Sequence, residues 1–321
     1  MAREKQPLLH NKVFGHTVAI AFYVILGYFL FSAASNMNYI WKWTSVPKYF
    51  AYEKVETLEA PFDGTIQING TRLVIEGRED SKELEVEKGY TLVVKNGDSV
   101  YESDKIAQKS SMQIGPLLEG LIVTLQISGF AAILAFSIGF LLALMRISSY
   151  QFLKDIATVY IAIIRGTPLL VQIFIFYFII ATIFELERFM AGAISLGLFF
   201  GAYIAEVLRG AIQSIDKGQY EAAKSLGMNY VQTMIYIVMP QALKRALPTL
   251  VGEMIALVKD SSLVSVISIT DLTKVGREIV ANTFSPFETW LIIAAMYFAI
   301  TFLLSALGHN IETKMKKQGG M

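Results

Sequence analysis

Long apolar runs alternate with short polar segments along most of this chain. A membrane-spanning helix needs about 20 mostly apolar residues. The pattern predicts about six such helices, at about residues 17–34, 116–145, 168–184, 189–212, 247–267 and 287–307. Residues 44–111 differ, because apolar and polar residues alternate there as they do in strands. The expected fold class is an all-α polytopic membrane protein with a small β-rich domain inserted after the first helix.

This pattern divides the chain into three regions. Residues 1–43 hold the N-terminus and the first span, and residues 44–111 form the β domain. Residues 112–321 form a five-helix core, which contains a polar loop at about residues 214–245. Within the β domain, strands are expected at 65–68, 72–75 and 90–94, with Asn69-Gly70 and Asn96-Gly97 as turns between strands.

Composition supports the membrane assignment and excludes other classes. The chain is 54% hydrophobic and 17% charged, which is too apolar for an ordinary soluble domain of 321 residues. The net charge of +1 gives no reason to expect a nucleic-acid partner, and the absence of cysteine excludes disulfides and thiolate metal sites. His10, His16 and His309 are scattered near the predicted membrane ends, so no metal site is expected.

Basic residues in the short loops set the expected orientation. If the N-terminus lies inside, the following basic residues also lie inside: Arg146, Lys154, Arg165, Lys217, Lys224, Lys244, Arg245, Lys314, Lys316 and Lys317. This arrangement satisfies the positive-inside rule. Both termini and the 214–245 loop are therefore expected in the cytoplasm, and the β domain outside. Arg165, Lys244 and Arg245 are expected to extend to the lipid headgroups.

The polar loop carries a helix-forming stretch that is followed by a turn. Its marker residues are Glu221, Ala222, Ala223, Gly227, Met239 and Pro240. Glu and Ala favour a helix, and Gly227 permits a sharp turn without a Cβ penalty. Pro240 and Pro248 are expected to stop or kink the chain after it. The spacing resembles the EAA loop of bacterial ABC importer permeases, with Met239 where that family usually has Leu.

Four further stretches resemble the polar amino acid branch of these permeases, which has a MetI-like membrane fold. They are residues 120–125, 165–172, 205–210 and 257–263, and the resemblance covers the chain from about residue 113 to its end. It implies a permease subunit of an ATP-driven importer in a prokaryotic inner membrane. It also implies two ABC ATPase subunits, a second permease chain, the same or a sister, and an extracytoplasmic amino-acid-binding protein.

The chain itself has no G-x-x-x-x-G-K-[ST] phosphate loop, so ATP is expected to be bound by the partner subunits. The chain is therefore expected to be a transporter subunit without cofactor and without enzymatic activity. The 221–240 loop is expected to receive the movement of the ATPases and to pass it to the membrane helices. Which amino acid is carried is left open by the sequence.

Ionisable residues inside the predicted spans are candidates for the substrate path, because such groups are costly in a bilayer. Glu206 lies in the fourth span, and Lys259 and Asp260 lie in the fifth. We hypothesise that Glu206 and Asp260 meet the ammonium group of an amino acid, while Thr167, Lys259 and Ser262 face its carboxylate.

Two other interpretations concern the same part of the membrane core. Glu206 could instead form a structural ion pair with Arg209 or Lys259 that locks two helices, and the sequence favours neither interpretation. Gln172 is a further candidate on the path. Thr167 is also expected to cap the third span, with Pro168 as its first helical residue.

The β domain shows a separate resemblance. Residues 60–66 and 94–100 are similar to the two half-repeats of the lipoyl/biotinyl barrel-sandwich fold, in which Asp-Gly and Gly-Asp turns reverse the strands. Lys82 lies between Ser81 and Glu83, unlike the modified lysine of that family, so no prosthetic group is expected. A generic β-rich insert is the alternative. The domain could dock the binding protein, cover the outer mouth of the path, or stabilise a dimer.

Three rival functions fit the sequence less well. A secondary transporter usually shows inverted repeats, which are not seen here, and would give the 221–240 loop no purpose. An efflux adaptor needs long coiled-coil heptads and a single span. A membrane sensor needs a cytoplasmic output domain.

Overall fold

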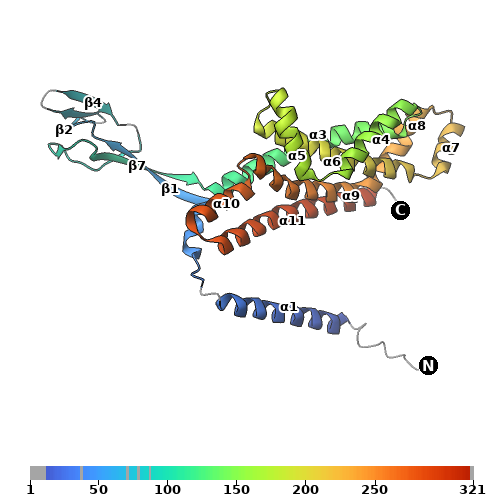
Figure 1. Ribbon diagram of the computed structural model, residues 1–321, viewed down its shortest axis with the longest axis horizontal. Coiled ribbons are helices and arrows are strands. Elements are labelled where there is room, and N and C mark those ends of the chain that lie inside the picture. Colours follow the sequence, from blue (N-terminus) through green and yellow to red (C-terminus); the bar gives the residue numbers. More distant parts are fainter. Residues whose placement is uncertain (1–11, 37–38, 70–71, 78–79, 87, 319–321) are drawn as a thin grey trace. The chain divides into compact units, whose positions relative to one another are not determined.

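The computed structural model describes residues 12–36, 39–69, 72–77, 80–86 and 88–318 (Figure 1). The chain divides into two units, residues 1–43 and residues 44–321. The first unit contains helix α1 (Lys12–Ser35), which is apolar on all sides, as expected of a helix that is surrounded by lipid. Tyr39, Trp41 and Trp43 follow it, and the rings of the two tryptophans stack at 5.7 Å. Such aromatic residues are typical of a membrane interface.

The second unit begins with a short 3-10 turn η2 (Trp43–Ser45), helix α2 (Pro47–Phe50) and a domain of two antiparallel sheets. One sheet has the order β1 (Ala51–Glu59), β7 (Lys105–Ile114), β5 (Thr91–Leu92). The other has the order β4 (Ser81–Glu85), β3 (Arg72–Glu76), β2 (Gly64–Asn69), β6 (Ser99–Val100). The strands predicted at 65–68 and 72–75 are confirmed, whereas the strand predicted at 90–94 is only two residues long.

Alternate residues of these strands form the core of the β domain. Ile66, Leu73, Ile75 and Ile106 are almost fully buried, in keeping with the two-residue period of the sequence. Gly97 has φ +88°, and the Asn96 side chain accepts a hydrogen bond from Ile68 N at 2.8 Å. The turn predicted at Asn96-Gly97 is therefore confirmed. Gly70, in the other predicted turn, lies outside the described residues. The similarity to a barrel-sandwich fold stays a prediction.

Helical segments make up the rest of the described chain. They are α3 (Pro116–Ile147), α4 (Gln151–Gly166), α5 (Leu169–Ile175), the π-helical η3 (Phe176–Ala181), α6 (Arg188–Gln213), α7 (Lys217–Ser225), α8 (Tyr230–Thr233), the π-helical η4 (Met234–Val238), α9 (Met239–Asp260), the 3-10 segment η5 (Ser261–Ile267), α10 (Leu272–Thr283) and α11 (Pro286–Gln318).

Helices α3 and α6 pack closely side by side at the centre of the membrane core (Figure 1). Small residues permit this approach, as they commonly do between helices in lipid. A Cβ atom added to Gly139 would lie 2.6 Å from the Ile204 side chain, and one added to Gly197 would lie 2.7 Å from Leu134. The glycines of the second and fourth predicted spans therefore set the distance between the two helices.

Within the described residues, four helical stretches are long and apolar enough to cross a membrane: Val13–Ala33, Pro116–Ile147, Arg188–Gln213 and Pro286–Met315. A fifth crossing results if α4 and the α5–η3 segment, which meet at a bend of 109°, form one broken span. The span predicted at 247–267 is not among them. Helix α9 covers residues 239–260 and carries several charges, and the chain then tightens into η5. The expected number of about six spans stays a prediction.

Candidate functional site

The loop after α6 folds into a short capped helix that ends in a tight turn. Asp216 caps α7 by accepting a hydrogen bond from Gly218 N. At its other end, Gly227 has φ +75°, Gly227 N bonds to Lys224 O at 3.0 Å, and Met228 N bonds to Ala223 O at 3.1 Å. These two bonds form a Schellman turn, in which glycine occupies the left-handed position. The predicted helix and the turn at Gly227 are both confirmed.

The chain after this turn is helical for longer than expected. The Asn229 and Gln232 side chains form a reciprocal capping box at the start of α8. The chain then stays helical through η4 and α9 to Asp260. Pro240 and Pro248 therefore do not stop the helix, and the kink that was the other expectation at these residues stays a prediction. Pro240 lies directly after the π-helical turns of η4, where the altered hydrogen-bonding pattern tolerates a residue that lacks a backbone N–H.

Side-chain contacts tie this loop to two helices of the membrane core. Gln241 of α9 donates a hydrogen bond to Gln219 of α7 at 3.1 Å. Arg245 of α9 donates to both the carbonyl and the hydroxyl oxygen of Ser214, at the end of α6. Arg245 thus binds a helix end, where carbonyl groups lack partners, and its expected place at the lipid headgroups stays a prediction. Helix α9 is thus hydrogen-bonded both to α7 and to the end of α6.

The solvent-exposed surface of the loop and of the helix that follows it presents apolar side chains that nothing in the described chain covers. Leu226 is 81% exposed, and the following exposed residues include Tyr230, Val231, Ile235 and Tyr236. Ala223 is buried, whereas Glu221 and Ala222 are exposed. Met239 is partly buried and packs on the cluster around Met234 and Val238. An exposed apolar patch of this kind is typical of a protein interface.

A second group of residues surrounds Glu206 on α6. Its carboxylate accepts hydrogen bonds from Arg209 Nε at 3.0 Å and from Arg209 Nη2 at 2.9 Å. Arg146 Nε lies 3.5 Å and Arg165 Nη1 lies 3.7 Å from the same carboxylate. Three guanidinium groups, from α3, α4 and α6, therefore face one carboxylate.

The structure thus contains the Glu206–Arg209 ion pair, one of the two interpretations that the sequence left open. Lys259 is not among the basic groups that pair with Glu206 within the described part of the chain. The Arg165 guanidinium also lies over the Tyr203 ring, 5.1 Å from its centre. The Arg165 side chain thus contacts the aromatic face and the carboxylate, and its expected reach to the headgroups stays a prediction. Sequence reasoning missed Arg146, which lies at the end of α3, distant in sequence from its partner.

Thr167 and Gln172 lie at the break between α4 and α5. Gln172 Nε2 donates to Ile164 O and Thr167 Oγ1, both at 2.7 Å. The Thr167 hydroxyl donates to Ile163 O, and Pro168 takes the cap position of α5. The expectation that Thr167 caps this helix is therefore wrong. Both polar side chains instead satisfy carbonyl groups near the break, which lipid could not do.

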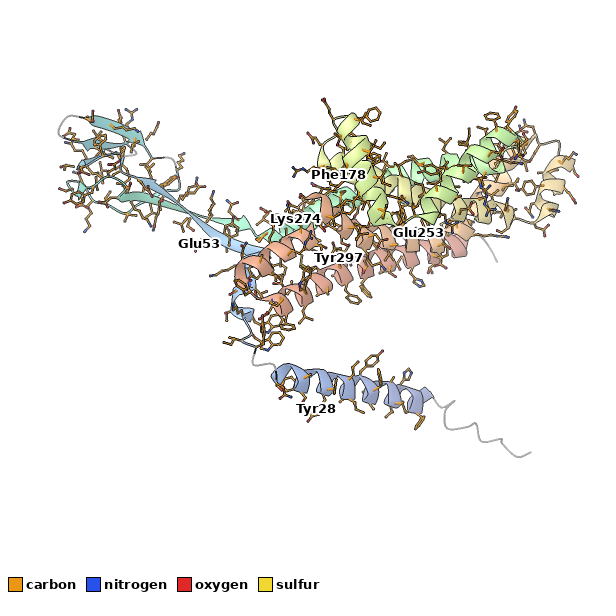
Figure 2. All side chains as sticks on the ribbon, viewed as in Figure 1. Tyr28, Glu53, Phe178, Glu253, Lys274 and Tyr297 are labelled. Carbon is orange, nitrogen blue, oxygen red and sulfur yellow. The ribbon has the colours of Figure 1, made fainter. Side chains whose placement is uncertain are left out.

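The polar end of α9 borders a cavity of about 300 Å³ between α9, α10 and α11. Its lining includes Lys259, Ser262 and Trp290, together with Thr273 and Tyr297, whose hydroxyls lie 3.1 Å apart (Tyr297 is labelled in Figure 2). Lys259 makes no hydrogen bond or salt bridge within the described residues. Asp260 is half-buried but is not part of this lining. Of the residues predicted on the substrate path, the structure thus brings Lys259 and Ser262 together at this cavity, and Thr167 and Gln172 together at the helix break.

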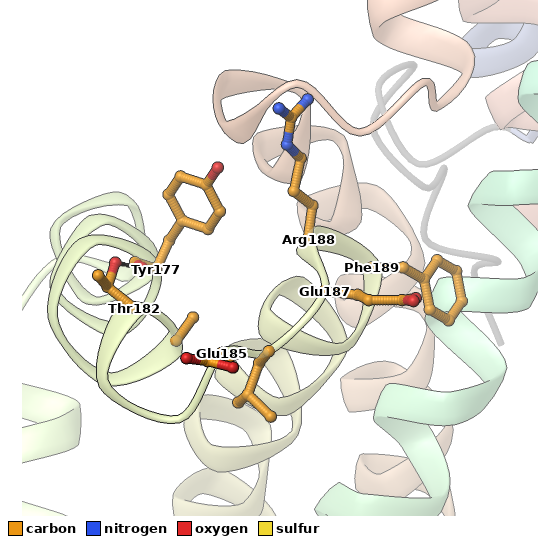
Figure 3. A pocket seen from close by; sticks show the side chains of 8 residues that line it. Tyr177, Thr182, Glu185, Glu187, Arg188 and Phe189 are labelled. Carbon is orange, nitrogen blue, oxygen red and sulfur yellow. Dashed lines mark hydrogen bonds between the residues drawn. The ribbon is translucent and has the colours of Figure 1, made fainter.

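A larger hollow of about 720 Å³ opens where η3 turns into α6. Figure 3 shows Tyr177 and Arg188 on facing sides of this hollow, with Thr182 and Glu185 near Tyr177. Glu187 precedes α6 and Arg188 is its first residue. The turn therefore offers charges of both signs at the end of α6 that is opposite the 214–245 loop.

Comparisons with known proteins agree with these features. Residues 135–317 match the family described as the binding-protein-dependent transport system inner membrane component. The arginine transport system permease protein ArtQ of Bacillus subtilis is 36% identical over 206 residues, which are 64% of this chain and 94% of that protein. The glutamine transport system permease protein GlnP of Escherichia coli K12 is 38% identical over 203 residues, which are 62% of this chain and 93% of that protein.

Solved structures point to the same fold. A crystal structure of an amino acid ABC transporter with histidines matches with a TM-score of 0.58 and 41% identity, over 62% of this chain and 94% of that chain. The MetNI methionine ABC transporter in an inward-facing conformation matches with a TM-score of 0.55 and 18% identity, over 62% of this chain and 96% of the other, which supports the fold alone.

Because the family model matches more than half of the chain, this protein belongs to the binding-protein-dependent transport system inner membrane components. It is a permease subunit of an ABC importer, a multi-pass protein of the bacterial inner membrane. It is not an enzyme, since ATP hydrolysis in this family lies in separate subunits. The expectations of a permease subunit and of a MetI-like core are thereby confirmed.

Proposed function

We propose that this chain forms the translocation pathway of an importer for a polar amino acid, in a pair with the same or a sister chain. Two cytoplasmic ABC ATPase subunits drive it, and an extracytoplasmic binding protein delivers the substrate. The substrate class is supported by relatives named for arginine and glutamine transport and by a structural neighbour described as an amino acid transporter. Both termini lie in the cytoplasm in this proposal, as the positive-inside rule favours.

The loop around α7 is the proposed contact with the ATPase. Two observations together support this contact. Leu226 and Tyr230 expose an apolar surface, and hydrogen bonds join α7 to α9 and α9 to Ser214 at the end of α6. In this proposal, a force applied to α7 moves α9 through the Gln219–Gln241 bond, and α9 moves the end of α6 through the Arg245–Ser214 bonds. Since both helices belong to the membrane core, closure of the ATPases is converted into movement of the pathway.

The proposed pathway passes the polar end of α9 and the region of Glu206. Lys259 and Ser262 line a cavity there, and a lysine that forms no salt bridge within the described residues of a membrane protein is a functional candidate. We propose that these two residues bind the carboxylate of the substrate and that Asp260 binds its ammonium group. Glu206 contributes to the pathway either by contacting the substrate or by holding α3, α4 and α6 together through their arginines. Thr167 and Gln172 shape the pathway by holding the break between α4 and α5.

The test is co-purification of the tagged chain with its partners from its native membrane, with mass spectrometry to identify them. We expect an ABC ATPase with the native chain and its loss from the Leu226→Glu variant, which puts a charge on the exposed patch. Tyr101→Glu is the matched control, because Tyr101 is 69% exposed but lies in the β domain. It should retain the ATPase. Absence of any ATPase from the folded native chain would contradict the proposal and favour a secondary transporter.

A further inference from the structure

Strands β1 and β7 form a two-stranded ribbon where they approach the membrane helices. Residues Ala51 to Glu56 pair with residues Lys109 to Ile114, whereas β5 pairs with β7 further along, at Ala107 and Gln108. No third strand of the described chain pairs with the ribbon. A lone two-stranded ribbon is only marginally stable in water. A surface that covers one of its faces would therefore stabilise it.

The two faces of the ribbon differ in chemistry. Cross-strand pairs share a face, and one face consists of Ala51 with Ile114, Glu53 with Met112, and Val55 with Ser110. We call these six residues the ribbon face. Its apolar members are open to solvent, with exposed fractions of 51% for Val55, 78% for Met112 and 52% for Ile114.

The opposite face carries most of the charged residues of the ribbon, together with Tyr52, which is 40% exposed, and Gln113. It includes Lys54 and Glu56, which form a salt bridge of 2.8 Å, and Lys109 beside them. Antiparallel sheets commonly bury one face and leave the polar face in water. The alternation along β1 and β7 therefore indicates that the ribbon face packs against another molecule.

Glu53 is the ionisable residue of the ribbon face (Figure 2). Its carboxylate accepts a hydrogen bond from the Ser110 hydroxyl on the neighbouring strand. The carboxylate is thus held across the ribbon by a partner of its own chain. Glu53 is the one charged member of the six-residue ribbon face, and its apolar members outnumber it, which favours an apolar, permanent contact over a polar and reversible one.

The ribbon is fastened to the membrane core at its base. Gly115 N donates to Phe50 O at 2.7 Å, so the two strands stay joined up to the residue before α3. Tyr49 and Phe50 pack against the cluster of Leu117, Leu272 and Val275. Two copies of the chain in one membrane would therefore hold their ribbons at the same height, and residues of equal height would meet.

We propose that the ribbon face packs against the ribbon face of a second copy of this chain, about a two-fold axis parallel to the strands. This inference rests on the proposed pairing of permease chains and makes that pair a homodimer. The axis places β1 of one copy over β7 of the other, so Val55 lies over Ser110 of the second copy. It likewise places Glu53 over Met112 rather than over a second Glu53, which avoids contact between like charges. A binding protein suits this surface less well, because it must leave in every transport cycle.

The test uses the absence of cysteine in the native sequence. Two differently tagged copies are co-expressed, one with Val55→Cys and the other with Ser110→Cys, and native membranes are treated with a short bis-maleimide. Because packed sheets lie about 10 Å apart, a direct disulfide would not span the gap, whereas this reagent would. The matched control is Glu56→Cys with Lys109→Cys, the equivalent cross-strand pair on the charged face.

We expect a cross-linked dimer from the first pair, about tenfold more abundant than from the control, because only one face of a ribbon can lie against the partner's sheet. Equal cross-linking on both faces, or none, overturns the proposal. Quenching of a Val55→Cys fluorophore by brominated lipids, without cross-linking, would show that lipid covers the face. Co-purification of the two tagged copies and of the ATPase is measured on the same membranes. If these persist without cross-links, the ribbon contact fails while the proposed importer stands.

Discussion

Glu206→Gln is the substitution that most sharply separates a structural role of this residue from a role on the substrate path. The native carboxylate receives two hydrogen bonds from Arg209 and lies within 3.7 Å of Arg146 and Arg165. The neutral amide keeps the size of the side chain but removes its charge. Three guanidinium groups that surround one anion would then repel one another across the ends of α3, α4 and α6.

The magnitude follows from the burial of these groups. Removing one partner of a fully buried ion pair costs about 3–5 kcal/mol, whereas an exposed pair is worth about 1 kcal/mol or less. The side chain of Glu206 is 19% exposed and that of Arg209 is 25% exposed, so the pair lies between these limits. We expect Glu206→Gln to cost about 2–3 kcal/mol of stability. Arg209→Gln should cost about 1 kcal/mol, because Glu206 keeps Arg146 and Arg165 as partners.

The assay combines thermal unfolding of the purified complex with uptake into vesicles. Glu206→Gln should lower the unfolding midpoint more than Arg209→Gln does. Gln213→Ala is the control, since Gln213 is exposed and accepts one hydrogen bond from Arg209, and its midpoint should hardly change. The reasoning is refuted if Glu206→Gln keeps the native midpoint but abolishes uptake, because Glu206 would then act on the pathway. It is also refuted if Arg209→Gln destabilises more than Glu206→Gln.

Three further substitutions test other parts of the site. Gly227→Ala should destabilise the loop by about 1–2 kcal/mol and weaken ATPase binding, because alanine is strained at φ +75°; Gly252→Ala, at an open helical position, should be neutral or stabilising in the same unfolding and co-purification assays. Gln172→Ala should cost about 1–3 kcal/mol in thermal unfolding, since Ile164 O loses its side-chain partner at the helix break; an unchanged midpoint would show that another group satisfies this carbonyl. Burial raises the pKa of Asp271, the cap of α10, above its usual 3.8, although hydrogen bonds from Lys274 N and Thr273 N oppose the shift. The stability of the native protein relative to Asp271→Asn should therefore fall as the pH rises from 3.8 through the raised pKa, and a pH-independent difference in unfolding midpoint would contradict this.

Local patterns in the sequence predicted the local structure well. The strands at 65–68 and 72–75 and the turns at Gly97 and Gly227 depend on neighbouring residues, through alternation of side chains and the freedom of glycine at positive φ. Prolines were less reliable guides. Pro240 and Pro248 were expected to stop or kink the chain, but it stays helical through both, and π-helical turns directly precede Pro240.

Most contacts in the candidate site could not be predicted from the sequence. Lys259 and Ser262 are close in sequence, and the cavity that they share with Trp290 and Tyr297 depends on the packing of α11 against α9. Arg146 could not be matched with Glu206 from spacing, because 60 positions separate them and three helices must meet first. Arg165, Arg245 and Gln172 were recognised as polar, but their partners are carbonyl, aromatic and carboxylate groups that only the folded chain brings near.

The sequence by itself determined the class of this protein: a run of apolar segments for a bilayer, one inserted β domain, and a polar loop with Glu221, Ala222 and Gly227 at a distinctive spacing. These features depend on hydrophobicity and local backbone preference, which act over a few residues. Tertiary structure alone decided which charges pair, how α4 and α5 meet at 109°, and which face of the β1–β7 ribbon is left uncovered. Those outcomes depend on contacts between distant segments, whose energies exist only after the helices and strands have packed.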